Sequence, residues 1–143
     1  MIVSQILKAK GSDVATIGPA ASLAEAATKL ARGRIGALVV TARDGEIVGI
    51  ISERDIVQAI AVSRTQALDQ PVEAVMTHRV ATCAPADSLE SLMREMTARR
   101  VRHLPVVSEG RLAGIVSIGD VVKHRLDELE RERAMLVQYV ANG

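Results

Sequence analysis

The sequence predicts an α+β fold made of two repeats, each with the order strand, helix, strand, strand, helix, and a long helix at the C-terminus. The first observation is an internal duplication: residues 14–23 align with residues 80–89, and seven of the ten positions are identical. The second is that the same succession of helical and alternating apolar patterns follows each copy. A unit of about sixty residues is small for an independent core, so we expect the two units to pack against each other.

The extent of the duplication sets the domain boundaries. After a one-residue deletion the alignment carries Asp55 onto Asp120, so it reaches far beyond the first ten positions. A short amphipathic segment leads into each copy, at residues 3–7 and at residues 72–76. We therefore assign residues 1–65 to the first repeat, 66–125 to the second and 126–143 to a C-terminal helical extension.

A helix is predicted directly after the aligned segment of each repeat. In the first repeat Ser22 and Glu25 form a capping-box pattern, and Gly33 marks the end of the helix. In the second repeat Asp87 or Ser88 supplies the cap. Helical spacing gives each helix one apolar face toward the core: Leu23, Ala26, Ala27 and Leu30 in the first, and Leu89, Leu92, Met93 and Met96 in the second.

A β-hairpin is predicted after each of these helices. Asp44-Gly45 and Glu109-Gly110 supply the positive backbone angle that a tight turn needs. Pro105 cannot donate a hydrogen bond, so its strand is expected either to begin there or to lie at a sheet edge. The paired strands are residues 36–41 with 47–51, and residues 104–107 with 112–116.

The last element is one long helix from Asp120 onward. Its apolar positions alternate steps of four and three, which is typical of a coiled-coil seam and predicts self-association into a homodimer. A helix packed on its own protomer is the alternative, and Arg133 interrupts the pattern. The seam consists of Val122, Leu126, Leu129, Arg133, Leu136 and Val140.

The most informative motif is a repeated Gly-Ile-(Ile/Val)-Ser-x-x-Asp, at residues 49–55 and 114–120. A strand ends and a helix begins there, so backbone N–H groups can attract an anion and the Asp can accept two hydrogen bonds from a ribose diol. The alternative is purely structural: Ser52 and Ser117 are helix caps, and each Asp completes a capping box. A cap and a ligand contact can coexist.

Composition argues against several classes of protein. The formal net charge is +1, Trp and Phe are absent and Tyr139 is the only Tyr, so we expect no nucleic-acid partner. The N-terminus lacks the pattern of a secretion signal, and no apolar run is long enough to span a membrane. We therefore expect a cytoplasmic protein without a membrane partner.

Catalysis and metal binding are not expected. Cys83, the only cysteine, lies in a strand-like context that fits a buried residue in a reducing compartment. Cys83 and His103 could form a nucleophile and base pair, but no third orienting residue is evident. The three histidines, His78, His103 and His124, are too scattered for a metal site.

Both units resemble the CBS (cystathionine-beta-synthase-type) domain in element order, hairpin and terminal Ser-x-x-Asp motif. Two segments are similar in sequence to bacterial proteins made of this domain pair alone: Ile-Ser-Glu-Arg-Asp at 51–55 and Arg-His-Leu-Pro-Val at 102–106. The resemblance covers almost the whole chain. It implies a pseudo-twofold disc, called a Bateman module, with two clefts for adenosine-containing ligands and a tendency to dimerise.

The same resemblance implies the ligand contacts. Asp55 and Asp120 would hold ribose hydroxyls, and Ser52 and Ser117 would approach ribose or phosphate. The other implied contacts are Thr16, Ile17, Ile35, Ala37, Thr82, Cys83, Val101 and His103 around adenine, Arg54, Arg102 and His103 at phosphate, and also Pro105 and Ile118.

The two clefts are expected to differ. Glu53-Arg54 corresponds to Ile118-Gly119, and Gly36-Ala37 corresponds to Arg102-His103, so one cleft can be occupied and the other vestigial. The small Gly119 favours Asp120 as the ribose ligand.

Two functions remain open from the sequence. The leading hypothesis is a non-enzymatic regulator that needs no cofactor, binds AMP, ADP or ATP ahead of S-adenosylmethionine or NAD, and signals to an effector protein in trans. The alternative is a ligand-free dimeric interaction module.

Overall fold

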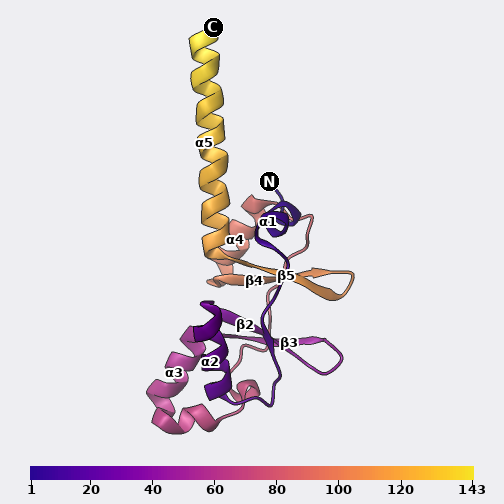
Figure 1. The fold of residues 1–143 in the computed structure, drawn as a ribbon, viewed down its shortest axis with the longest axis vertical. Coiled ribbons are helices and arrows are strands. Elements are labelled where there is room, and N and C mark those ends of the chain that lie inside the picture. Colours follow the sequence, from indigo (N-terminus) through magenta and orange to yellow (C-terminus); the bar gives the residue numbers. More distant parts are fainter.

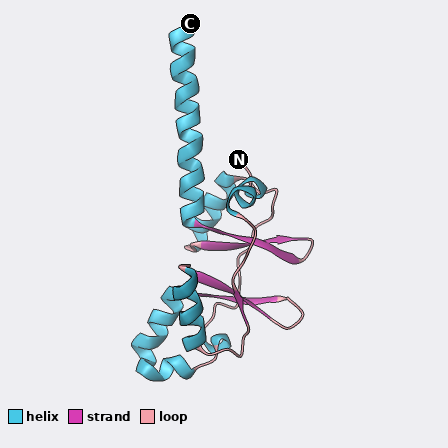
Figure 2. Cartoon of the chain, viewed as in Figure 1, coloured by secondary structure: helices cyan, strands magenta, loops and turns pink.

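The computed structural model describes all 143 residues as two lobes and a projecting helix (Figure 1). One lobe holds β2, β3, α2 and α3, and the other holds α1, α4, β4 and β5 (Figures 1 and 2). The elements in chain order are α1 Val3–Lys10, β1 Thr16–Ile17, α2 Leu23–Gly33, β2 Ala37–Thr41, β3 Ile47–Ser52, α3 Glu53–Ser63, the 3₁₀ turns η1 Arg64–Asp69 and η2 Val72–Ala74, α4 Leu89–Arg99, β4 His103–Ser108, β5 Arg111–Ser117 and α5 Ile118–Asn142. This order confirms the predicted α+β repeats.

The sheets of the two repeats differ at their first strand. In the first repeat β1 pairs parallel to β2, and β2 pairs antiparallel to β3. In the second repeat only β4 and β5 form a sheet, and the first strand is reduced to one bridge between Cys83 and Val106. The nitrogen of Val39 donates to the carbonyl of Ala15 over 3.2 Å, whereas the equivalent position is Pro105, which has no N–H. The missing donor explains the shortened strand.

Pro105 itself lies inside β4. The strand begins two residues earlier, at His103, which excludes the first of the two predicted alternatives, a start at Pro105. The side of β4 that faces away from β5 is nearly an edge, since only Cys83 pairs with it. The Pro105 carbonyl accepts a 2.9 Å bond from the Cys83 N–H, so the proline nitrogen also faces the segment that carries Cys83.

The predicted caps are largely present. The Ser22 hydroxyl accepts from the Glu25 N–H, but the reciprocal bond from the Ser22 N–H to the Glu25 carboxylate, which would complete a box, is absent. In the second repeat the cap is Ser88, whereas Asp87 bonds the Ala84 N–H. Helix α2 ends at Gly33 as predicted, although the left-handed residue that follows is Arg34.

The predicted apolar faces of α2 and α4 are buried except at their margins. Leu23, Ala26 and Leu30 are buried in α2, and Ala27 is partly buried. The face of α4 buries Leu89, Leu92 and Met96. Met93 is 37% exposed, so its assignment to the core was wrong.

The segment that precedes each repeat in the sequence packs in the core of the other repeat. Val3 and Ile6 of α1 pack in the core of the second repeat, while Val72 and Met76 pack in the core of the first. Helix α1 accordingly lies beside α4 and β5 in Figure 1. Each core therefore contains residues from both sequence repeats, which ties the two lobes together.

Helix α5 runs without a break from Ile118 to Asn142 and extends beyond the lobes (Figure 1). Val121 and His124 are its buried residues, and every residue from 129 onward is exposed. The apolar seam positions are therefore open to solvent. No helix has both the length and the apolar character needed to cross a membrane.

Candidate functional site: a cleft between the repeats

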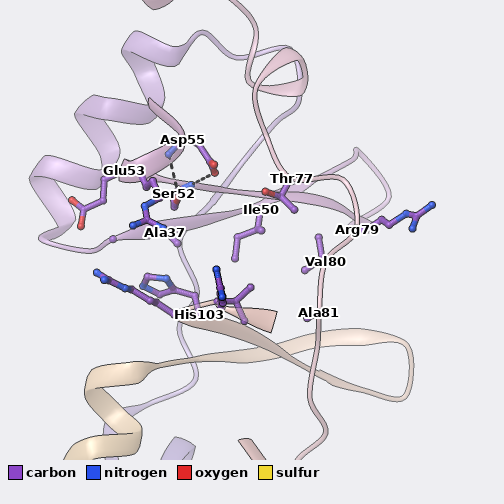
Figure 3. Close-up of a pocket in the computed structure, with 15 residues that line it drawn as sticks. Ala37, Ile50, Ser52, Glu53, Asp55, Thr77, Arg79, Val80, Ala81 and His103 are labelled. Atoms are coloured by element: carbon purple, nitrogen blue, oxygen red, sulfur yellow. Dashed lines mark hydrogen bonds between the residues drawn. The ribbon is translucent and has the colours of Figure 1, made fainter. Parts of the chain in front are cut away.

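A cleft of about 230 Å³ lies between the two lobes (Figure 3). The first repeat, the segment that follows η2, and the end of α4 with the start of β4 all contribute to it. Its lining residues are Gly36, Ala37, Ile50, Ser52, Glu53, Arg54, Asp55, Thr77, Arg79, Val80, Ala81, Arg100, Val101, Arg102 and His103.

Ser52 and Asp55 place the start of α3 at this cleft. The Ser52 hydroxyl accepts from the Asp55 N–H over 3.3 Å, and Asp55 Oδ2 accepts from the Ser52 N–H over 2.9 Å (Figure 3). This is the predicted capping box. Asp55 Oδ1 makes no hydrogen bond within the protein and the residue is only partly buried. One carboxylate oxygen thus serves the fold while the other is available to a ligand.

Aliphatic side chains form the apolar part of the cleft. Ile50 comes from β3, Val80 and Ala81 come from the segment that follows η2, and Val101 precedes β4. Figure 3 shows Ile50 and Val80 in the middle part of the cleft. Such surfaces can accept a flat heterocycle by packing rather than by aromatic stacking.

His103 closes one side of the cleft. It rises from the second repeat toward Ala37 and Ser52 of the first (Figure 3). Burial lowers the pKa of His103 from 6.5, with opposing contributions from the nearby carboxylates of Glu53 and Asp120 and further lowering by Lys10 and Arg102. The imidazole is therefore neutral at neutral pH and contributes hydrogen-bonding capacity rather than charge.

Positive charge in the cleft comes from arginines. Arg54, Arg79, Arg100 and Arg102 line it, against two carboxylates, those of Glu53 and Asp55. Arg79 extends away from the other labelled side chains (Figure 3). Guanidinium groups bind phosphate through paired N–H donors, so this lining is suited to an anionic ligand.

The second copy of the motif is engaged by a lysine. Ser117 and Asp120 form the same capping box at the start of α5. In addition, Lys10 Nζ lies 2.6 Å from Asp120 Oδ2 and donates to the Ile115 carbonyl over 2.9 Å. Burial alone would raise the pKa of Asp120, but hydrogen bonds from Lys10 and Ser117 outweigh it, so the pKa lies below 3.8.

Seven of the predicted contacts come together in the cleft: Ala37, Ser52, Arg54, Asp55, Val101, Arg102 and His103. The others lie elsewhere. Ile17, Cys83 and Pro105 are buried, Ile35 lies in a groove between α2 and α3, and Thr16 and Thr82 lie outside the cleft lining. Ser117, Ile118 and Asp120 belong to the second copy of the motif. The small Gly119 does not leave Asp120 unpaired, because Lys10 bonds its Oδ2, the oxygen that also completes the capping box.

The exchange of leading segments explains which residues were not predicted. The first repeat's own segment at residues 14–17 was expected beside Asp55, but the structure places residues 77–81 there. The sequence offered one signal for some of these residues: they lie next to the predicted contacts Thr82 and Val101. The lining residues absent from the prediction are Gly36, Ile50, Glu53, Thr77, Arg79, Val80, Ala81 and Arg100.

The duplicated fold, with an Asp completing a capping box at the start of the last helix of each repeat, defines a tandem CBS-domain protein. The CBS domain family model matches residues 3–62 and 72–127, so the chain belongs to this family. Proteins built from CBS-domain pairs are generally regulatory modules rather than enzymes.

Individual relatives extend this assignment. The chain is 38% identical over 87% of its length to an uncharacterized 17.7 kDa protein of Acidianus ambivalens, of which it spans 73%. It is 34% identical over 83% of its length to a mitochondrial CBS domain-containing protein of Arabidopsis thaliana, of which it spans 60%. A crystal structure of a CBS-domain containing protein from Agrobacterium tumefaciens superposes with a TM-score of 0.86 at 48% identity, covering 87% of this chain and 99% of that one.

Two further structural neighbours carry adenosyl ligands. A CBS domain protein from Pyrobaculum aerophilum is complexed with AMP; it has a TM-score of 0.75 at 32% identity, over 84% of this chain and 89% of that one. The CBS domain pair of protein MJ0100 is complexed with 5′-methylthioadenosine and S-adenosyl-L-methionine; it has a TM-score of 0.80 at 26% identity, over 90% and 98% of the two chains. Relatives of this fold thus hold adenosine-containing molecules.

Proposed function

We propose that this protein is a non-enzymatic regulatory module that binds an adenine nucleotide in the cleft beside Asp55 and signals to a partner protein in trans. The observation that carries the proposal is Asp55: one carboxylate oxygen caps α3, and the other is free at the edge of a cleft with aliphatic and arginine side chains. The adenosyl ligands of the structural neighbours support the same class of ligand.

Each part of the nucleotide has a matching group. Asp55 accepts hydrogen bonds from the ribose hydroxyls, as a carboxylate can from a diol. Ile50, Val80 and Val101 pack against adenine. Arg54 at the start of α3 and Arg102 before β4 bind phosphate, aided by the backbone N–H groups of the helix start.

The charge of the cleft favours AMP, ADP or ATP over S-adenosylmethionine. Four arginines against two carboxylates leave an excess of positive charge, which attracts phosphate and repels a sulfonium group. NAD also carries phosphate, so it belongs in the same binding test as the adenine nucleotides. Neither ligand is a cofactor in this proposal, since binding changes the surface that a partner contacts.

The absence of catalysis is part of the proposal. Burial and the charge of Asp87 raise the pKa of Cys83 to about 12, so the thiolate that a nucleophile needs is disfavoured. The cysteine is 8% exposed and packs in the core of the second repeat. A structural role accounts for it.

A homodimer formed through α5 is the second part of the proposal. Leu126, Leu129 and Leu136 are 55%, 43% and 65% exposed, and they lie at coiled-coil spacing on a helix that extends beyond the lobes. A ligand-free dimeric interaction module would use the same helix. The two functions differ only in whether the Asp55 cleft binds a ligand.

Isothermal titration with adenosine, AMP, ATP, S-adenosylmethionine and NAD tests the proposed function. We expect AMP or ATP to bind more tightly than adenosine and S-adenosylmethionine. Asp55→Asn keeps an oxygen that can cap α3 but removes the charge, and should weaken ATP binding at least about tenfold, or about 1.4 kcal/mol. Arg102→Ala should weaken ATP more than adenosine, whereas Arg43→Ala, in the hairpin turn outside the cleft, should weaken neither.

The negative outcome is equally informative. Folded protein, shown to be free of carried-over nucleotide, that binds no member of this panel would exclude adenosyl sensing by these ligands. The dimeric interaction module would then be the better account.

A further inference from the structure

The two copies of the Ser-x-x-Asp motif differ in the hydrogen-bond and charged partners of their Asp residues. Asp55 Oδ2 accepts a bond from the Ser52 N–H, and no cation pairs with this carboxylate. Asp120 Oδ2 accepts from the Ser117 N–H at 2.9 Å, the Ser117 hydroxyl at 3.0 Å and Lys10 Nζ at 2.6 Å. We call the position formed by Ile115, Ser117 and Asp120 the Asp120 site.

Lys10 reaches this site because α1 is longer than its counterpart. Six residues separate Leu7 from Val14, but only three separate Met76 from Val80. The extra residues continue α1 as far as Lys10, and the core of the second repeat holds the helix in place through Val3 and Ile6.

The lysine also replaces a backbone interaction. In the first repeat the Ile50 carbonyl accepts from the Thr77 N–H over 2.9 Å. The equivalent Ile115 carbonyl accepts from Lys10 Nζ over 2.9 Å. A single ammonium group thus bridges the strand end and the carboxylate at the helix start.

Two hydrogen-bond acceptors, rather than burial, hold the Lys10 ammonium group, because Lys10 is an exposed residue. The side chains of Lys10 and Asp120 are 31% and 20% exposed, and two acceptors hold the ammonium group. A ribose using Asp120 Oδ2 would have to displace Lys10 from both acceptors, and one using Oδ1 would have to share the carboxylate with the bound ammonium group. The corresponding carboxylate in the open cleft, Asp55, presents no such barrier.

We infer that Lys10 is an internal occupant of the Asp120 site, which limits the protein to one nucleotide per chain, bound beside Asp55. This inference rests on the proposed function, because it names which of two related positions the ligand can use. Lys10 acts as a specificity-determining residue: it imitates a ligand's hydrogen-bond donor at Asp120.

Titration of four proteins with ATP tests the inference by stoichiometry. Wild type should bind one equivalent per chain, and Lys10→Ala should bind two. The double variant Lys10→Ala/Asp120→Asn should bind one equivalent of ATP, at the Asp55 cleft. The double variant Lys10→Ala/Asp55→Asn should also bind one equivalent, at the Asp120 site. Lys8→Ala is the matched control, since Lys8 lies on the same helix without contact to Asp120, and it should bind one. Thermal melts establish that each variant is folded.

A second readout needs no ligand. Acetylation of lysines, followed by mass spectrometry, should modify Lys10 several-fold more slowly than Lys8 in wild type, and at a similar rate in Asp120→Asn. Equal rates in wild type would overturn the inference.

The outcomes separate this inference from the proposed function. Two equivalents bound by wild type, or one by Lys10→Ala, would overturn the role of Lys10 while leaving nucleotide binding intact. No binding by wild type with one equivalent at Asp120 in Lys10→Ala would overturn the Asp55 proposal alone. No binding by either protein would overturn both.

Discussion

His103 of the second repeat packs directly against Gly36 of the first. A Cβ atom at Gly36 would lie 3.1 Å from His103 Cε1 and 3.2 Å from Nε2, so no larger residue fits there without moving the imidazole. The Glu53 carboxylate would lie 3.3 Å from the same Cβ. The imidazole is therefore held between the lobes, where a change in its charge affects both.

This position predicts a loss of stability in mild acid. Because burial lowers the pKa of His103 in the folded protein, the unfolded chain takes up a proton first as pH falls through 6.5. Stability is complete above pH 6.5 and is lost as the pH falls toward the folded-state pKa. Thermal melting temperatures should fall between about pH 7 and pH 5, and should fall less in His103→Gln.

The choice of pH range and control isolates this group. The pKa of Asp120 lies below 3.8, so its contribution is present above pH 3.8 and is lost only below that range. His78→Gln, at an exposed residue, should keep the wild-type pH dependence. If His103→Gln showed the full wild-type loss, another group would be responsible.

Gly49 predicts a second, structural effect. A Cβ there would lie 2.9 Å from Met76 Cγ and 3.0 Å from the Thr77 carbonyl oxygen, and would also meet Met76 Sδ. Gly49→Ala should therefore destabilise the protein by about 1–3 kcal/mol through overpacking. At Gly119, in the first turn of α5, a Cβ meets only Ser117 Oγ at 3.6 Å, so Gly119→Ala should be neutral or stabilising by up to about 1 kcal/mol. Urea unfolding of both variants compares them; equal destabilisation would contradict the packing argument.

Cys83 should react with iodoacetamide far more slowly than an exposed thiol. Raising its pKa from 9.0 to about 12 lowers the thiolate fraction at pH 8 roughly a thousandfold. Thr82→Cys combined with Cys83→Ala moves the thiol to an exposed neighbouring position and serves as the control. Mass spectrometry should show rapid alkylation of that variant and, in wild type, alkylation only after denaturation. Similar native rates would show that Cys83 is accessible.

The proposed dimer predicts a change of mass in solution. Leu126→Glu places a charge in the α5 seam and should convert a dimer to a monomer in light scattering after size exclusion. Ala134→Glu introduces the same charge at an exposed position of α5 outside the seam and should remain a dimer. A monomeric wild type, or a dimeric Leu126→Glu variant, would place self-association elsewhere or exclude it.

The elements that sequence patterns predicted well are those made by neighbouring residues. Ser22, Ser52, Ser88 and Ser117 cap helices because each bonds an N–H three residues ahead. The hairpins likewise follow from Gly45 and Gly110, whose positive φ angles of 85° and 76° close the turns. Such interactions can be inferred from a short stretch of chain.

The site also depends on contacts between distant parts of the chain. The repeated motif identified Asp55 and Asp120 equally well, and Gly119 even favoured Asp120. Only the tertiary structure brings Lys10 onto Asp120 and places Val80 and Ala81 beside Asp55. The physical reason is that α1 and the segment after η2 pack on each other's repeats, a long-range choice made by core burial that no local pattern records. The sequence by itself determined the duplicated fold and the two carboxylates; packing decided which of them is paired with a lysine.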